Sequence, residues 1–176
     1  MVGWSDLPAD LSDHGMIARL SAYLPKDAVV VSSDLIRAAA TATAVQAERR
    51  RLLHDPQLRE MHFGAWELRS HTEVEAETPD LIRAFWDTPG AVRPPDGESW
   101  TDLNTRVWAA TDRLTADFPG RNIVVVAHFG AILSAVQRAC GLTPLQAFSH
   151  RIDNFSVTDM TLGPQGWQIG RINHIV

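Results

Sequence analysis

The sequence has one cysteine, no long hydrophobic run and fewer basic than acidic residues. Because Cys140 is the only cysteine among 176 residues, no disulfide can form within the chain, and a reducing compartment is the simplest expectation. No stretch approaches the roughly 18 to 20 apolar residues of a membrane span, and no signal-peptide pattern opens the chain. A net charge of -5 disfavours a nucleic-acid partner. We expect a soluble, cytoplasmic protein with neither membrane nor nucleic-acid partners.

The size and composition fit one domain. With 45% hydrophobic residues, residues 1–176 are enough for a single core of their own. Cys140 continues an apolar helical pattern, so we expect it to be buried. The basic run Arg49–Arg51 follows a predicted helix, where cations suit the negative end of the helix dipole, and we expect it to be solvated.

The first third of the chain has the order helix, strand, helix. Apolar residues recur at helical spacing over 12–24 and predict a short amphipathic helix. Residues 28–32 form a continuous β-branched run, which is typical of a buried strand. Ser33 and Asp34 then offer caps for an alanine-rich helix over 35–48.

The same order returns later in the chain. Residues 122–127 are an apolar run followed by His-Phe-Gly and a second amphipathic segment. A predicted helix over 101–117 supplies the crossover that a parallel strand requires. Two strand-to-helix junctions of one type predict a parallel, helix-covered sheet. Residues 155–162 and 167–173 flank a Gly-Pro-Gln-Gly turn and predict an antiparallel pair at one edge.

Residues 69–100 fit neither the helical nor the strand period and contain four prolines, so we interpret them as a cap or lid segment. The fold class predicted from all these segments is α/β. It is a three-layer sandwich with a mostly parallel sheet, an antiparallel edge, helices on both faces and a small cap.

Two polar residues fall where parallel sheets bind ligands, beyond the carboxyl ends of the strands. Arg37 lies in the first turn of the helix after 28–32, so its guanidinium and the local amides can converge on one anion. His128 directly follows 122–127. Taken singly, each has an ordinary reading, as an exposed arginine on a helix and as a histidine at a strand end. Their matching positions favour an anion site.

Four segments in order resemble the histidine phosphatase (phosphoglycerate mutase-like) superfamily. The sequence SSDLIRAAATA (32–42) is similar to its S-S-D-L-x-R-A-x-x-T-A segment, and LREMHFGAWE (58–67) to its L-x-E-x-x-x-G-x-W-E segment. PPDGES (94–99) resembles its P-P-G-G-E-S run, and VVVAHFGAI (124–132) its second-histidine strand. The resemblance implies a phosphoglycerate mutase-like fold for nearly the whole chain.

The resemblance also implies roles for particular residues. It makes Arg37 a phosphate-binding arginine, Glu60 the proton donor and His128 the second histidine, which takes part in both catalysis and phosphate binding. Phe129, beside His128, is a phosphate-binding position as well. Neither a metal nor another cofactor is implied, and the expected ligand is a small phosphorylated substrate. Before the motif is considered, Glu60 in an Arg-Glu pair would read as ordinary surface charge.

Three residues depart from glycines of the pattern, namely Leu68, Asp96 and Phe129. Phe129 is expected to narrow the pocket, which leaves the substrate class open. The family's nucleophilic histidine, in an Arg-His-Gly motif after a first apolar strand, has no match, and we expect such a strand to precede Met1. His14 precedes a glycine but follows no apolar run. We expect it to begin the first helix, with a nucleophilic role as the alternative.

The leading hypothesis is a phosphomonoesterase that acts on a small phosphorylated metabolite through a phosphohistidine intermediate. A phosphoglycerate mutase is the alternative within the same family. A phosphate-binding pseudoenzyme is the alternative from another class, because the nucleophile is missing. Four tryptophans in or beside 69–100 fit either an aromatic substrate pocket or simple packing of the cap, and we expect packing.

Overall fold

Three parallel strands form the main sheet of the computed structural model, which describes residues 1–176. The central strand β1 (Val29–Ser32) pairs with β2 (Arg50–Arg51) on one side and with β3 (Ile123–Val126) on the other. The continuous valine runs of β1 and β3 are what a strand covered on its faces requires. The predicted strands 28–32 and 122–127 are thus confirmed.

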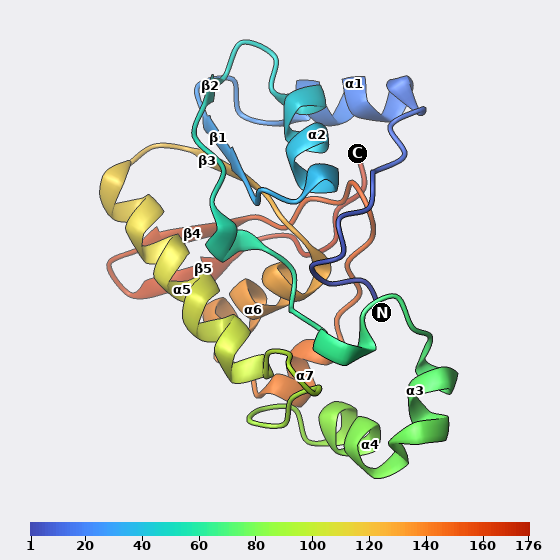
Figure 1. Cartoon of the computed structure of the whole chain (residues 1–176). Helices are drawn as coiled ribbons and strands as arrows, with labels where there is room; N and C mark the ends of the chain where they lie inside the picture. The colour runs from blue at the N-terminus through green and yellow to red at the C-terminus, as the bar shows by residue number, and fades with distance from the viewer.

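Helices cover both faces of β1, as predicted. On one face α1 (His14–Tyr23) and α2 (Ile36–Val45) share a buried cluster that is packed against Val124 and Val126 of β3. On the other face, α5 (Trp100–Asp117) packs two buried side chains against Val31 of β1. Figure 1 shows α1 and α2 together beside the sheet and α5 running along the opposite side.

The last third of the chain adds two helices and a hairpin. The helix α6 (Phe129–Cys140) follows β3 directly and packs against α5, and α7 (Pro144–Phe148) follows α6. The antiparallel pair, β4 (Met160–Gly163) and β5 (Gly166–Ile169), is a two-stranded sheet of its own beside α6. The predicted hairpin is therefore present, but as a separate sheet and not at an edge of the parallel sheet, so the free edge of β3 has no strand partner.

The predicted lack of helical order over 69–100 was wrong for its first half. Residues here form α3 (His71–Glu77) and α4 (Pro79–Asp87), at the end of the molecule away from β1 (Figure 1). The start of α3 is a capping box between Ser70 and Glu73, and this Ser-x-x-Glu pattern can be recognised in the sequence. The prolines of this segment favoured the prediction of an irregular structure. Pro79, however, occupies the first turn of α4, where proline is compatible with a helix.

The short segments before α3 bring the cap to the core. Two 3₁₀ turns, η1 (Pro56–Leu58) and η2 (Gly64–Trp66), lie between β2 and α3. The largest buried cluster joins side chains of η2, α3, α4, α5, α6 and α7.

Two of the residues that replace glycines of the motif, Leu68 and Asp96, have φ of 61° and 59°, a conformation in which glycine is favoured.

Three local predictions were wrong. Ser33 and Asp34 do not cap α2, because Leu35 is the N-cap and makes no side-chain hydrogen bond there. Arg49 is not solvated: it is 5% exposed and donates to backbone carbonyls at the ends of α1 and α2. Cys140 is exposed, because it is the last residue of α6, where the helix turns away at Gly141. None of the helices combines the length and hydropathy that crossing a membrane requires.

Candidate active site

The carboxyl ends of β1 and β3 bring three polar side chains into contact. Ser33 follows β1 and is fully buried, and its Oγ lies 2.6 Å from Nε2 of His128, which follows β3. Arg37, in the first turn of α2, donates from Nε to Nδ1 of His128 at 3.2 Å. Arg37 and His128, which were predicted as a pair, are therefore brought together by the pairing of β1 with β3. The paired residues Val29 and Ile123 are 94 residues apart along the chain.

Its two hydrogen bonds fix the protonation state of His128. An arginine nitrogen can only donate, so Nδ1 of His128 accepts and Nε2 carries the proton that Ser33 receives. Burial, together with the charges of Arg37 and Arg106, lowers the pKa of His128 from 6.5 to about 3. The imidazole is thus neutral at physiological pH and can donate a hydrogen bond from Nε2.

Glu60 lies buried at the start of α6, 7% exposed. Its carboxyl group accepts from the backbone N–H of Gly130 at 3.0 and 3.1 Å and from that of Met61 at 2.7 Å. Burial raises the pKa of Glu60, while these hydrogen bonds and the charges of Arg37 and Arg106 oppose the rise. A carboxyl group that holds its proton unusually well is suited to act as an acid.

Gly130 is required for this contact. A Cβ at this position would lie 2.3 Å from Oε1 of Glu60. Because no real Cβ approaches an oxygen so closely, any larger residue displaces the carboxyl group from the first turn of α6. This matches the sequence pattern, in which a glycine follows two residues after the second histidine.

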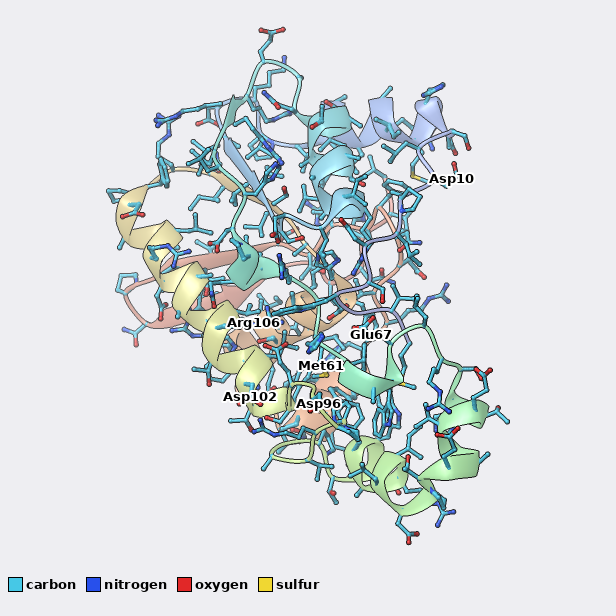
Figure 2. All side chains as sticks on the ribbon, viewed as in Figure 1. Asp10, Met61, Glu67, Asp96, Asp102 and Arg106 are labelled. Carbon is cyan, nitrogen blue, oxygen red and sulfur yellow. The ribbon has the colours of Figure 1, made fainter.

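Arg106 on α5 holds the backbone of the Glu60 segment. It donates to the carbonyls of Arg59 and Glu60, both at 2.7 Å, and forms an ion pair with Glu98 at 2.7 Å. Figure 2 shows Arg106 on the side of α5 that faces Met61, the residue after Glu60. Arg106 is the residue of the site that sequence reasoning missed, since a helix position near the middle of α5 carries no local signal.

The segment of residues 3–5 lies across the guanidinium of Arg37. The two NH₂ groups of Arg37 donate to the carbonyls of Gly3 at 2.6 Å and Ser5 at 3.0 Å. Glu67, which is labelled in Figure 2, has a structural role. It accepts hydrogen bonds from the backbone N–H groups of Gly3, Trp4 and Ser5 and so fixes this segment. Both NH₂ groups of Arg37 thus already have a partner.

Two further candidates lie in different surroundings. Phe129 is the first residue of α6, so its N–H belongs to the turn that has no acceptor within the helix, while its side chain is 48% exposed. His14 is the first residue of α1, as expected, and makes no hydrogen bond with Arg37, Glu60 or His128. No group of three His, Cys, Asp or Glu side chains is arranged to hold a metal ion.

The arrangement defines a class of protein: an α/β protein with an arginine, a neutral histidine and a buried acid at the carboxyl ends of parallel strands. Such a set can bind an oxyanion and give it a proton. The sequence matches the description "Histidine phosphatase superfamily (branch 1)" over residues 1–175. The chain therefore belongs to the histidine phosphatase superfamily, which confirms the resemblance and the predicted fold class.

Individual relatives and structures agree with this assignment. The chain is 37% identical to "Bifunctional protein Rv2228c" of Mycobacterium tuberculosis over 128 residues, which are 72% of this chain and 33% of that protein. It is 32% identical to the "Adenosylcobalamin/alpha-ribazole phosphatase" of Escherichia coli over 71% of this chain and 62% of that one. The structure of mycobacterial glucosyl-3-phosphoglycerate phosphatase Rv2419c superposes with a TM-score of 0.84 at 25% identity, covering 100% of this chain and 92% of that one.

The curated relatives are longer than the matched region. The chain spans about a third of the length of the mycobacterial relative and less than two thirds of the Escherichia coli phosphatase. Substrates and reactions of the longer proteins belong to those proteins.

Proposed function

We propose that the chain is a phosphomonoester hydrolase of the histidine type, acting on a small phosphorylated metabolite. The observation that carries the proposal is the buried Glu60, whose pKa is raised, beside the neutral His128 and Arg37. In this reaction a histidine nitrogen bonds to phosphorus while the bond to the leaving oxygen breaks, and Glu60 gives that oxygen its proton. Water then attacks the phosphohistidine, releases phosphate and returns a proton to Glu60.

The binding groups follow from the same geometry. Arg37 and the Nε2–H of His128 are donors for the oxygens of the transferred phosphoryl group, and the free amides at the start of α6, including that of Phe129, add to them. Binding at this position requires the guanidinium of Arg37 to exchange its carbonyl partners, and the Nε2–H of His128 to exchange the hydroxyl oxygen of Ser33, for oxygens of the phosphate. A charge-assisted bond to phosphate is the stronger of the two.

A place for the nucleophile is supported by the free edge of β3. This edge carries no strand, and Val125 of β3 is 38% exposed, whereas β1 is buried throughout. A further parallel strand paired there would end beside His128, since carboxyl ends of parallel strands meet at one edge. We propose that the nucleophilic histidine is delivered in this way, by a further strand that pairs along this edge of β3.

Three further expectations remain part of the proposal. Residues 1–176 form one histidine phosphatase-like domain in which 69–100 act as the cap. A cytoplasmic location fits the single cysteine, for the reason given above. A phosphoglycerate mutase would transfer the phosphoryl group to a second hydroxyl in place of water.

A second function, phosphate binding without turnover, is favoured by one observation. The hydrogen-bond partners of His128 are Ser33 and Arg37, and no other histidine is among them. Such a protein would bind a phosphorylated compound and leave it intact.

Hydrolysis of p-nitrophenyl phosphate at mildly acidic pH, without added metal, tests both functions. Turnover that is lost in Arg37→Ala and kept in Arg83→Ala, an exposed arginine of α4, supports the hydrolase. Binding of inorganic phosphate without turnover, measured by titration calorimetry, supports the binding protein. If phosphate does not bind at all, both functions are wrong.

A further inference from the structure

A cavity opens beside Glu60, and six aromatic side chains line it. They come from the segment before η2, from α4, from the start of α5, from α6 and from the end of α7, and they are Phe63, Phe85, Trp86, Trp100, Phe129 and Phe148. Glu60 is the only charged residue of the lining. The cavity has a volume of about 40 Å³, so it is narrow.

The position of the cavity relates it to the leaving group of the proposed reaction. Glu60 lines the cavity and also accepts from the N–H of Gly130, in the first turn of the helix that His128 precedes. A leaving oxygen that takes its proton from Glu60 therefore lies next to a residue of the cavity wall. The group that this oxygen carries can then enter the cavity.

The walls of the cavity suit an apolar group. Apart from Glu60, no lining side chain bears a charge, so a charged or sugar-like leaving group would lose its hydration without gaining partners. The rings already meet edge to face, with centroids 4.6 Å apart for Trp100 and Phe148 and 5.0 Å apart for Phe85 and Trp86. A further aromatic ring can make contacts of the same kind.

Two tryptophans of the wall differ in how firmly they are held. The indole N–H of Trp100 donates to Oε1 of Gln137 at 2.6 Å, and Trp100 is 2% exposed. The indole nitrogen of Trp86 is buried as well but has no hydrogen-bond partner. Because no hydrogen bond restrains Trp86, its side chain can shift and widen the cavity. Its indole N–H can also donate a hydrogen bond to an acceptor atom of the ligand.

We propose that this aromatic cavity binds the leaving group and makes the protein selective for phosphate esters of flat, apolar alcohols such as aryl phosphates. The inference rests on the proposed phosphate site and adds the substrate class to it. The tryptophans of the cap thus serve an aromatic pocket in addition to packing.

The test measures dissociation constants by titration calorimetry, so it requires no nucleophile. Three probes are compared: inorganic phosphate, glycerol 1-phosphate and 1-naphthyl phosphate. We expect 1-naphthyl phosphate to bind at least about tenfold more tightly than glycerol 1-phosphate, as expected for burial of an apolar ring. Trp86→Ala should reduce this ratio at least about fivefold.

Trp108→Ala is the matched control, since Trp108 is a half-buried tryptophan of α5 outside the cavity, bonded to the carbonyl of Ser134. The ratio should be unchanged in this variant. Trp86→Phe keeps a ring at the position and should retain most of the ratio. Trp86→Leu, which removes the ring and keeps an apolar side chain, replaces Trp86→Ala if the latter does not fold. If the protein binds inorganic phosphate but has equal affinity for the two esters, the proposed aromatic pocket is wrong and the proposed phosphate site is retained. Failure of all three probes to bind overturns the phosphate site and this inference with it.

Discussion

The strands β1 and β3 are both rich in valine but have different surroundings. Both contain four residues, lie parallel and pair in register from Val29 with Ile123 onward. Every residue of β1 is buried, at 2% exposure or less, whereas no residue of β3 is buried and Val125 is 38% exposed. The difference arises because β1 has a strand on each side, while β3 has one on a single side.

The comparison extends to the residues that follow the strands. The end of β1 provides the groups that can hold an anion, Ser33 and Arg37, and the end of β3 provides His128 and the helix start that contacts Glu60. The strand with a partner on each side thus precedes Ser33 and Arg37, and the strand with one free edge precedes His128 and the helix start that contacts Glu60. Half of the site is anchored in the core, and the other half borders an edge where a further strand can pair.

The largest expected effect concerns Glu60, whose carboxyl group contacts the start of the helix that follows β3. In a protein that hydrolyses phosphate esters, Glu60→Gln should lower kcat for an alkyl phosphate by about 10² to 10⁴-fold, because its leaving oxygen requires a proton. For p-nitrophenyl phosphate, whose leaving group is stable as an anion, the loss should be less than about tenfold. Steady-state kinetics on both esters measure this difference.

Glu75→Gln, at a half-exposed position of α3, is the matched control and should leave both rates unchanged. Equal losses for the two esters in Glu60→Gln would show that Glu60 has a positioning role and is not the proton donor.

The next effect concerns the pH dependence of stability through His128. Its pKa is lowered from 6.5 to about 3, so the unfolded chain binds a proton more readily than the folded one. The stabilisation is present above pH 6.5 and is lost as the pH falls toward 3, with an upper limit of roughly 5 kcal/mol from the pKa difference. Urea unfolding at pH 7 and pH 4 should show a smaller loss in His128→Gln than in the unmodified protein.

Glu60 works in the opposite direction. Its raised pKa contributes stability that is present at low pH and is lost as the pH rises through the folded pKa. Because Glu60 is present in both proteins, the difference between them isolates His128. Parallel pH curves would mean that His128 does not titrate as its burial implies.

The burial difference between the strands predicts a difference in stability. Val30 is 0% exposed in β1, so Val30→Ala should lower the free energy of unfolding by about 2 kcal/mol. Val125 is partly exposed in β3, and Val125→Ala should cost about 0.5 kcal/mol. Urea denaturation of both variants tests this pair. Similar costs would indicate that β3 is covered in solution as β1 is.

The smallest effect concerns the bond that links the two strand ends. Ser33→Ala removes the acceptor of the Nε2–H of His128 and should cost about 1 kcal/mol of unfolding free energy. Ser12→Ala, which changes an exposed serine, is the control and should have no measurable effect. A neutral result for Ser33→Ala would mean that water replaces the hydroxyl, and that the two ends are joined through Arg37 instead.

Much of the fold was predictable from local pattern. The segments that became β1, β3, α1, α2, α5 and α6 have strong apolar periods, and the hairpin has a clear turn. The helices α3 and α4 were missed because prolines obscured a capping box that is present in the sequence. Arg49 was misread because its partners, the carbonyls of α1 and α2, come from segments up to 28 residues away.

The sequence by itself determined the family, the strand and helix segments, and the candidates Arg37, Glu60 and His128, since motifs and periods are local properties of a chain. The tertiary structure decided how these residues meet. The carboxyl group of Glu60 accepts a hydrogen bond from the N–H of Gly130, 70 residues away. Ser33 was predicted as a helix cap, but its hydroxyl group contacts His128, 95 residues away. Which strand is closed and which is open was likewise decided by long-range pairing, because burial depends on neighbours in space that no local pattern specifies.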